Sequence, residues 1–221
     1  MSVIYVDPYI DRNTGTMKNP LGITNQEELS ETEAELTGIT IRELSRDPIK
    51  GNFDFEHLCK VHEKIFGDIY SWAGYPRIIN MEKSEEVLKG NSVEYVDYEN
   101  IQQEASAVLK RMNSIKWDKL TLDERVKEFS SCMADLWKVH PFREGNTRTT
   151  VTFCCDFARA KNFGLDRDLF RDHGDYVRRA LVVASARFTN MGKDVLDLSK
   201  PEYLEKFVKD CMERWEKAHP R

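Results

Sequence analysis

The chain has 221 residues, which suits one large domain or one domain with an extension. Hydrophobic residues make up 40% and charged residues 32%, enough for a buried core and an ordinary charged surface. The formal net charge of −5 argues against non-specific binding to nucleic acid or to an anionic membrane.

The first eight residues carry no basic region and no long apolar run, so the sequence predicts no signal peptide. No stretch approaches membrane-spanning length, and we expect no membrane association. The five cysteines are an odd number and form no C-x-x-C pair. We therefore expect free thiols in a reducing, cytoplasmic environment.

Residues 1–22 are polar and contain Pro8, Gly15, Pro20 and Gly22, which predicts an irregular N-terminal arm. After this arm, apolar residues recur at spacings of three and four, the period of an amphipathic helix. The pattern predicts helices over about residues 25–44, 54–67, 98–115, 123–139, 147–160, 166–188 and 201–218.

Residues 68–96 break the helical pattern with an aromatic turn and then a short β-like run. That run consists of Arg77, Ile78, Ile79, Asn80 and Met81. A second apolar patch and a Gly-Asn turn follow, so we expect a small β-hairpin over about residues 75–92, called the flap below. The sequence thus predicts a mostly α-helical single domain over residues 23–221, with a core at about 50–190 and a terminal helix at 201–218.

The sequence HPFREGNTRT at residues 140–149 joins two predicted helices. A loop that leads into a helix N-terminus offers unpaired N–H groups and the positive end of a dipole, which favours an anion. Gly145 allows close backbone approach, Arg148 supplies a fixed charge, and Glu144 can hold a divalent metal. We expect His140 to face the bound anion and to take a proton from an incoming hydroxyl.

This loop resembles the motif of the Fic family, H-x-F-x-[DE]-G-N-G-R-x-x-R. The matching residues are His140, Phe142, Glu144, Gly145, Asn146 and Arg148. Residues 51–54, residues 65–74 and Arg77 also look like the segment that leads into the family's flap, and the similarity covers most of residues 25–190. The resemblance implies a Fic-type helical bundle with the flap beside the active site.

The resemblance also implies a protein adenylyltransferase, which moves AMP from ATP to a Ser, Thr or Tyr hydroxyl of a protein target, itself included. His140 would be the catalytic base, and Glu144 would hold the cofactor Mg²⁺. Residues 77–81 of the flap would pair with the target's main chain. The residues that bind the nucleotide phosphates would be Gly145, Asn146, Thr147 and Arg148.

Two positions depart from the family's motif. Thr147 stands where the family has its second glycine, and Val151 where it has its last arginine, which contacts the γ-phosphate. The loss of one charged hydrogen bond costs about 1.5–3 kcal/mol. Three alternatives stay open: another donor nucleotide, phosphate transfer as in Doc-type relatives, and a catalytically weak binding module. Assembly into a homo-oligomer also stays open.

The family's inhibitory pattern, [ST]-x-x-x-E-[GN], has only an imperfect counterpart in the first predicted helix. The nearest match is Ser30 with Glu35. The pattern requires a glutamate four residues after Ser30, where this chain has Ala34, and Glu35 lies one residue further on. We therefore expect any autoinhibition by Glu35 to be weak or absent.

Two other sets of residues are expected to have no role in the chemistry. His57 and His62 are five residues apart, which does not place two metal ligands on one helix face, so we expect packing or surface residues. Lys83 and Lys89 on the flap are expected to be solvated charges, and attraction of a phosphate tail stays open as the alternative.

Overall fold

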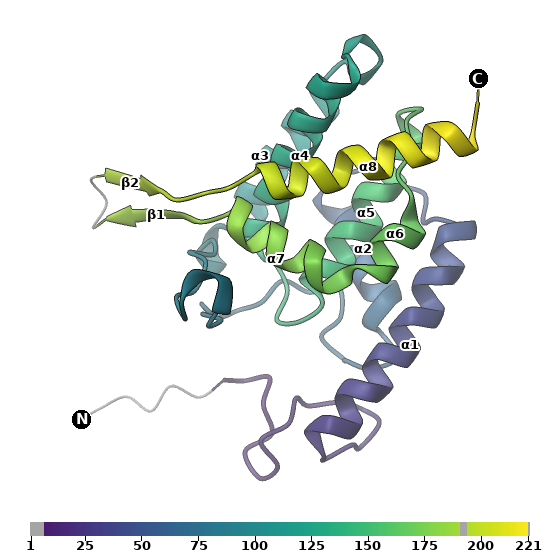
Figure 1. The fold of residues 1–221 in the computed structure, drawn as a ribbon. Helices are drawn as coiled ribbons and strands as arrows, with labels where there is room; N and C mark the ends of the chain where they lie inside the picture. Colours follow the sequence, from purple (N-terminus) through teal and green to yellow (C-terminus); the bar gives the residue numbers. More distant parts are fainter. Residues whose placement is uncertain (1–6, 191–193, 221) are drawn as a thin grey trace.

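The computed structural model describes residues 7–190 and 194–220, and most of these residues are helical. Three single turns of 3-10 helix occur at Glu86–Leu88, Tyr98–Asn100 and Trp117–Lys119. The other elements in chain order (Figure 1) are α1 (Gln26–Arg46), α2 (Phe55–Phe66), α3 (Ile101–Ser114), α4 (Leu122–Val139), α5 (Asn146–Ala160), α6 (Arg167–Asp172), α7 (Gly174–Ala184), β1 (Arg187–Asn190), β2 (Asp194–Asp197) and α8 (Glu202–Ala218). The predicted mostly α-helical class is confirmed.

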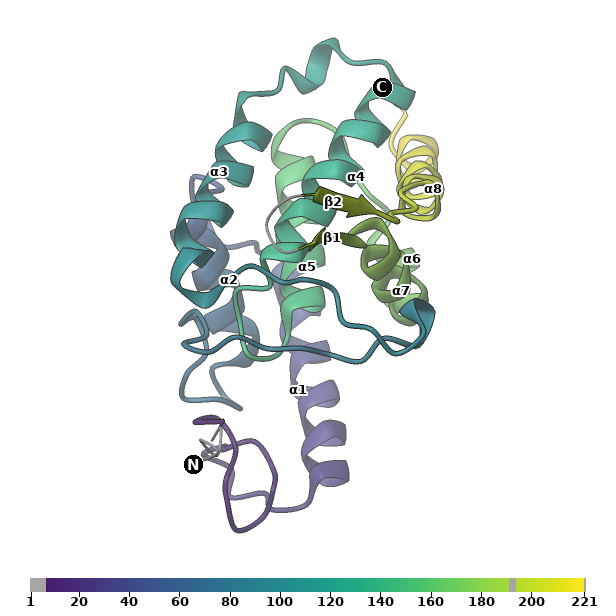
Figure 2. The same ribbon diagram turned by 90° about the vertical axis from the view of Figure 1, so that its left-hand side faces the viewer.

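Helices α4 and α5 lie at the centre of the bundle. α4 contacts α3, α5, α7 and α8, whereas α1 and α2 pack against α5 (Figures 1 and 2). Most of α5 is buried, including both neighbouring cysteines, Cys154 and Cys155. The segment that joins α4 to α5 is therefore held at both ends by buried helices.

Left-handed residues bound this connecting loop on both sides. α4 begins with a capping box between Thr121 and Glu124 and ends at His140, whose φ of 50° and ψ of 57° are left-handed. α5 begins after Gly145, with φ of 80°. Because two left-handed residues turn the chain sharply, the loop is short and its direction is fixed.

Residues 166–188 do not form one helix as predicted. The helix is interrupted at His173 and ends at Ala184, and residues 187–190 form β1. β1 pairs antiparallel with β2, so that Phe188 lies opposite Leu196. Gly174 explains the interruption because glycine is a weak helix former, and the pairing with β2 explains the end.

A small hairpin is present, but it is formed by β1 and β2 and not by residues 75–92. Residues 77–81 bend at Ile78 and Ile79 and have no strand partner among the described residues. The apolar patch that was expected to pair with them forms a 3-10 turn at Glu86–Leu88, which Lys89 and Gly90 end in left-handed conformations. The location predicted for the hairpin was therefore wrong.

All five cysteines are free, and four of them are buried. Among residues 7–190 and 194–220, no helix combines the length and apolar character that crossing a bilayer requires.

Candidate active site

The His140 side chain is fixed by contacts on several sides. Its ring stacks on Tyr95 with centroids 3.9 Å apart and meets the edge of Trp137 at 5.1 Å. Its Nδ1 lies 3.3 Å from the Trp137 carbonyl oxygen, which favours the tautomer that carries the proton on Nδ1. The His140 carbonyl oxygen accepts a hydrogen bond of 2.9 Å from Arg77 Nε.

This environment leaves His140 neutral with an available lone pair. Burial lowers the pKa of His140 well below its usual value, and Lys83 lowers it further. Nε2 is buried and makes no hydrogen bond with any described residue. His140 is only 3% exposed, because the Tyr95 ring covers its imidazole.

The Asn146 side chain makes two hydrogen bonds within the motif loop. Its Oδ1 accepts the Phe142 N–H at 2.9 Å, and its Nδ2 donates to the Phe142 carbonyl at 2.7 Å. Both ends of the amide are thus used to close the loop around the buried Phe142 ring. The Asn146 side chain braces the loop and is not free to bind a phosphate.

The backbone at the start of α5 is suited to binding an anion. The N–H groups of Asn146, Thr147 and Arg148 have no hydrogen-bond partner in the described part of the chain, as expected for a first helical turn. The Thr147 hydroxyl accepts a 2.9 Å hydrogen bond from Trp137 Nε1. Thr147 can therefore offer an anion its N–H, while its side chain ties α5 to α4.

Glu144 lies on the loop beside a cation. Its Oε2 is 3.2 Å from Lys83 Nζ, so Lys83 is not the solvated charge we expected, and its Oε1 accepts the Gly145 N–H at 3.0 Å. Burial alone would raise the pKa of Glu144, but Lys83 and these hydrogen bonds outweigh it and lower the pKa. Glu144 is ionised at neutral pH.

Glu144 also suits a magnesium ion bound mainly through a nucleotide. Within residues 7–190 and 194–220, no group of three or more His, Cys, Asp or Glu side chains could hold a metal. Mg²⁺ in phosphate-transfer sites commonly takes one or two protein carboxylates, with phosphate and water oxygens as the other ligands. One partly exposed carboxylate beside an anion site fits that donor set.

Arg148 makes an ion pair with Glu33 of α1, and its guanidinium also lies 4.8 Å from the Phe66 ring centre. Thr37 Oγ1 accepts a 3.0 Å hydrogen bond from it. Ser30 and Glu35, the residues nearest to the inhibitory pattern, are exposed on α1. The structure therefore places Glu33 beside Arg148 of the motif. The glutamate considered from sequence was Glu35, two residues later.

Arg77, predicted to dock a target, has a buried side chain that is 2% exposed. Its guanidinium donates to the carbonyl oxygens of His140, Val139, Ile79 and Val96. The Arg77 side chain thus joins the end of α4 to the flap and is buried away from solvent.

The other predicted flap residues lie nearer to solvent. Ile78 is 63% exposed, and its N–H donates to the Tyr9 hydroxyl at 3.2 Å. The Asn80 side chain bonds Asp97, at 2.7 Å. Ile79, Asn80 and Met81 line a groove of about 1250 Å³ that also reaches Arg143 of the loop.

The N-terminal arm touches both the flap and the motif loop. Asp7 Oδ2 accepts hydrogen bonds from Arg143 Nε and Nη2, at 3.0 and 2.8 Å. Tyr9 packs edge-on against Trp72, with centroids 5.2 Å apart. Through Asp7, the arm therefore contributes to the lining of the groove.

Sequence reasoning missed the importance of His62. This buried ring stacks between Phe66 and Phe142, at 4.7 and 3.7 Å. Its Nδ1 accepts the Gly74 N–H at 2.8 Å, and its Nε2 donates to the Glu144 carbonyl at 3.1 Å. The only available signal was its place in α2, because the partners lie 12 and 82 residues away.

The contacts of His62 require a neutral ring, which makes stability depend on pH. Burial lowers the pKa of His62 to about 3, whereas the unfolded chain takes this proton near pH 6.5. The contribution is thus fully present above pH 6.5 and is lost as the pH falls towards 3. We expect a loss of about 1.4 kcal/mol in the free energy of unfolding from this group between pH 7.5 and 5.5.

Urea unfolding at the two pH values measures this loss. His62→Gln should reduce the pH-dependent difference, whereas His219→Gln, at an exposed histidine, should leave it unchanged. An identical pH-dependent loss in wild-type protein and His62→Gln would contradict the assignment.

Comparison with known proteins identifies the family. The family model described as Fic/DOC family matches residues 52–158. The chain is 36% identical over 164 residues to the protein adenylyltransferase VbhT of Bartonella schoenbuchensis, a match that covers 73% of this chain and 33% of VbhT. It is 32% identical over 164 residues to the probable protein adenylyltransferase y4lH of Sinorhizobium fredii, covering 72% of this chain and 79% of y4lH. This chain belongs to the Fic/DOC family.

Solved Fic structures share the fold. The N-terminal Fic domain of a putative cell filamentation protein from Bartonella quintana, with bound ADP, has a TM-score of 0.74 at 23% identity, covering 92% of this chain and 93% of that one. BepC of Bartonella tribocorum, with bound AMPPNP, has a TM-score of 0.72 at 21% identity, covering 92% and 95%. The chain spans about a third of the length of VbhT. The Fic/DOC match, residues 52–158, contains α2, the flap, the motif loop and most of α5.

Proposed function

We propose that this chain is a protein adenylyltransferase, which transfers AMP from ATP to a Ser, Thr or Tyr hydroxyl of a protein target and of itself. The observation that carries the proposal is a neutral His140 with an unpartnered Nε2, followed by a free helix N-terminus in a Fic/DOC chain. The relatives' names, and the ADP and AMPPNP bound in related structures, support the choice of nucleotide. The catalytic domain in this proposal covers residues 23–221, and residues 1–22 are its arm.

In the proposed reaction His140 acts as the base. Its Nε2 takes the proton of the target hydroxyl, whose oxygen then forms a bond to the α-phosphorus of ATP. The bond between the α-phosphorus and the oxygen that bridges to the β-phosphate breaks, and pyrophosphate leaves. The N–H groups of Asn146, Thr147 and Arg148 face the charge that builds on the phosphate oxygens.

Tyr95 must leave His140 for this step because its ring covers the imidazole. Tyr95 belongs to residues 91–97, which also line the groove beside the loop. We infer that target binding in this groove moves Tyr95 and so uncovers the base.

Glu144 is the residue that would hold Mg²⁺, after its carboxylate is released by Lys83. The bound ion would neutralise phosphate charge and so make the phosphorus easier to attack. Lys83 would then add positive charge beside the phosphates. Such a charge is missing at Val151, where the family's motif has its last arginine.

The proposal is tested with ATP labelled at the α- or the γ-phosphate, with Mg²⁺, alone and with a cell extract. Transfer of the α-label to protein is the expected result. Transfer of the γ-label instead would replace the proposal with phosphate transfer, and transfer of neither would leave a binding module or another donor nucleotide. A mass spectrum of the purified protein would identify any nucleotide that it has attached to itself.

Glu33 is expected to compete with ATP for Arg148. A triphosphate must displace the Glu33 carboxylate from the guanidinium, and Glu33→Gln removes that charge while it keeps an acceptor for the Tyr70 hydroxyl. We expect the KM for ATP to fall about three- to tenfold, which corresponds to about 1 kcal/mol for a partly exposed pair.

Steady-state transfer rates at varied ATP concentration measure this effect. Glu35→Gln, on the exposed face of the same helix, is the matched control and should leave the KM unchanged. A higher KM in Glu33→Gln would mean that Glu33 positions Arg148 for binding, and a large rise in activity in Glu35→Gln would restore Glu35 as the inhibitory residue.

A further inference from the structure

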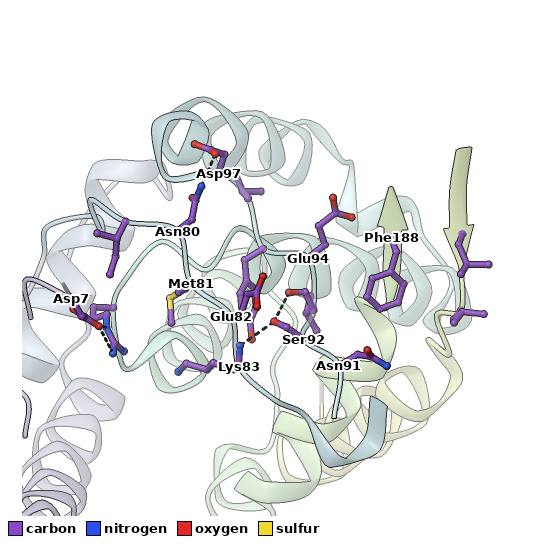
Figure 3. Close-up of a pocket in the computed structure, with 17 residues that line it drawn as sticks. Asp7, Asn80, Met81, Glu82, Lys83, Asn91, Ser92, Glu94, Asp97 and Phe188 are labelled. Atoms are coloured by element: carbon purple, nitrogen blue, oxygen red, sulfur yellow. Dashed lines mark hydrogen bonds and ion pairs between the residues drawn. The ribbon is translucent and has the colours of Figure 1, made fainter. Parts of the chain in front are cut away.

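The groove beside the motif loop has two walls from distant parts of the chain (Figure 3). One wall is the segment of residues 79–83, which has no regular secondary structure, and the other is the β1–β2 hairpin. Residues 91–97 run between them, and their Glu94 side chain accepts the Thr189 N–H at 2.7 Å. The volume of about 1250 Å³ exceeds the range of about 300–1000 Å³ that small-molecule sites occupy, which favours a polypeptide as the occupant.

The hairpin wall is apolar. Phe188 lies directly opposite Leu196 in the ladder, and Leu198 follows two residues later, so their side chains share one face. All three line the groove, and Leu196 and Leu198 are 54% and 55% exposed. This face offers an apolar patch that a ligand in the groove would cover.

The hairpin is attached firmly at its base. Arg187 makes a 2.7 Å ion pair with Asp135 of α4, and Lys138 Nζ donates to the Arg187 carbonyl at 3.0 Å. The apolar wall is therefore held at a fixed place relative to the helix that ends at His140.

The rest of the groove is negatively charged. Glu82, Glu94 and Asp97 line it, and none of them makes an ion pair with a described residue. The two cations in its lining are already paired, Lys83 with Glu144 and Arg143 with Asp7. The uncompensated carboxylates favour a basic ligand.

The flap wall also has unused backbone groups. The N–H groups of Met81 and Glu82 have no partner in the described part of the chain. An extended polypeptide could therefore pair its main chain with this wall while its side chains reach the opposite wall.

We propose that this groove selects its protein target by composition. The target segment is extended, carries Lys or Arg near the modified hydroxyl to meet Glu82, Glu94 and Asp97, and places a large apolar side chain on Phe188, Leu196 and Leu198. The inference rests on the proposed function, whose site it extends from the loop to the hairpin.

Fluorescent twelve-residue peptides with a central tyrosine test this selection on the full chain. Four versions combine basic or acidic flanks with an apolar or a polar residue, and fluorescence anisotropy without nucleotide gives their affinities. We expect the basic, apolar peptide to bind at least about tenfold more tightly than the acidic, polar one, and its affinity to weaken as salt is added. Equal affinities for the four peptides, or no binding of any of them, would overturn the proposal.

Two variants assign the selectivity to the two walls. The double variant with Leu196→Ser and Leu198→Ser should lose the preference for the apolar residue. The double variant with Glu82→Gln and Glu94→Gln should lose the preference for basic flanks. The controls, Leu21→Ser and Glu31→Gln, alter exposed residues outside the groove and should change neither preference. Unchanged preferences in the groove variants would also overturn the proposal.

Label transfer separates this inference from the proposed function. The same peptides are incubated with α-labelled ATP and Mg²⁺. Selective binding without any transfer, to peptide or to the chain itself, would contradict adenylyl transfer and leave the selectivity of the groove established.

Discussion

Replacing His140 with asparagine is expected to lower the rate of AMP transfer by about 10²–10⁴-fold, the usual contribution of a general base. Asparagine is the appropriate substitution because His140 is left-handed, with φ of 50°, and asparagine adopts that conformation at low cost. The amide cannot accept the hydroxyl proton. The initial rate of α-label transfer, at equal folded protein by circular dichroism, measures the loss.

Lys89→Asn is a matched control for this experiment. Lys89 is also left-handed, with φ of 56°, but it is exposed at the end of a 3-10 turn. Its replacement should leave the transfer rate unchanged. If His140→Asn retains a rate within about threefold of the wild type, His140 is not the base.

Replacing Gly145 with alanine is expected to disrupt the motif loop as a whole. A Cβ at this position would overlap the Phe66 ring, and the φ of 80° is itself unfavourable for any residue with a Cβ. Left-handed strain of about 1–2 kcal/mol and overpacking of about 1–3 kcal/mol together lower the free energy of unfolding by roughly 2–5 kcal/mol. Because the free N–H groups of α5 begin at the next residue, Asn146, we expect transfer to fall at least about 100-fold in the fraction that stays folded.

Urea unfolding and the transfer assay measure the two effects. Gly22→Ala separates strain from overlap, since Gly22 has φ of 72° but no atom within 4 Å of an added Cβ. It should lose only about 1–2 kcal/mol and keep full activity. Equal stability losses in the two variants would show that the Phe66 ring moves aside without cost.

The helices and the motif loop could be predicted from the sequence because they depend on local information. Apolar periodicity and end signals such as Gly67 placed α2, α4 and α5 within one or two residues. The loop could be recognised because six specified residues occur at fixed spacing. The break at His173 and the strand β1 were missed, since the residues of β1 also continue the helical period and only pairing with β2 decides their structure.

The contacts that support the loop could not be predicted because they join residues far apart in the chain. Arg77 was expected to meet a target but reaches carbonyl oxygens 62 and 63 residues away at the end of α4. Asn146 matches the family's motif, yet no pattern tells whether its amide meets a phosphate or the loop's own backbone. His62 and Glu33 gave no signal beyond their helices, and both reach the loop only in the folded chain.

The buried Arg77 guanidinium has a consequence for how such a chain can acquire new targets. The Arg77 guanidinium donates hydrogen bonds both to the Ile79 carbonyl in the flap wall and to the His140 carbonyl. A change that reshapes the flap wall is therefore expected to shift His140 as well. The hairpin wall is attached to α4 through the contacts of Arg187 with Asp135 and Lys138. These contacts do not involve His140. Evolution towards a different recipient protein is therefore expected to alter the hairpin leucines first, because they can vary without a penalty in turnover.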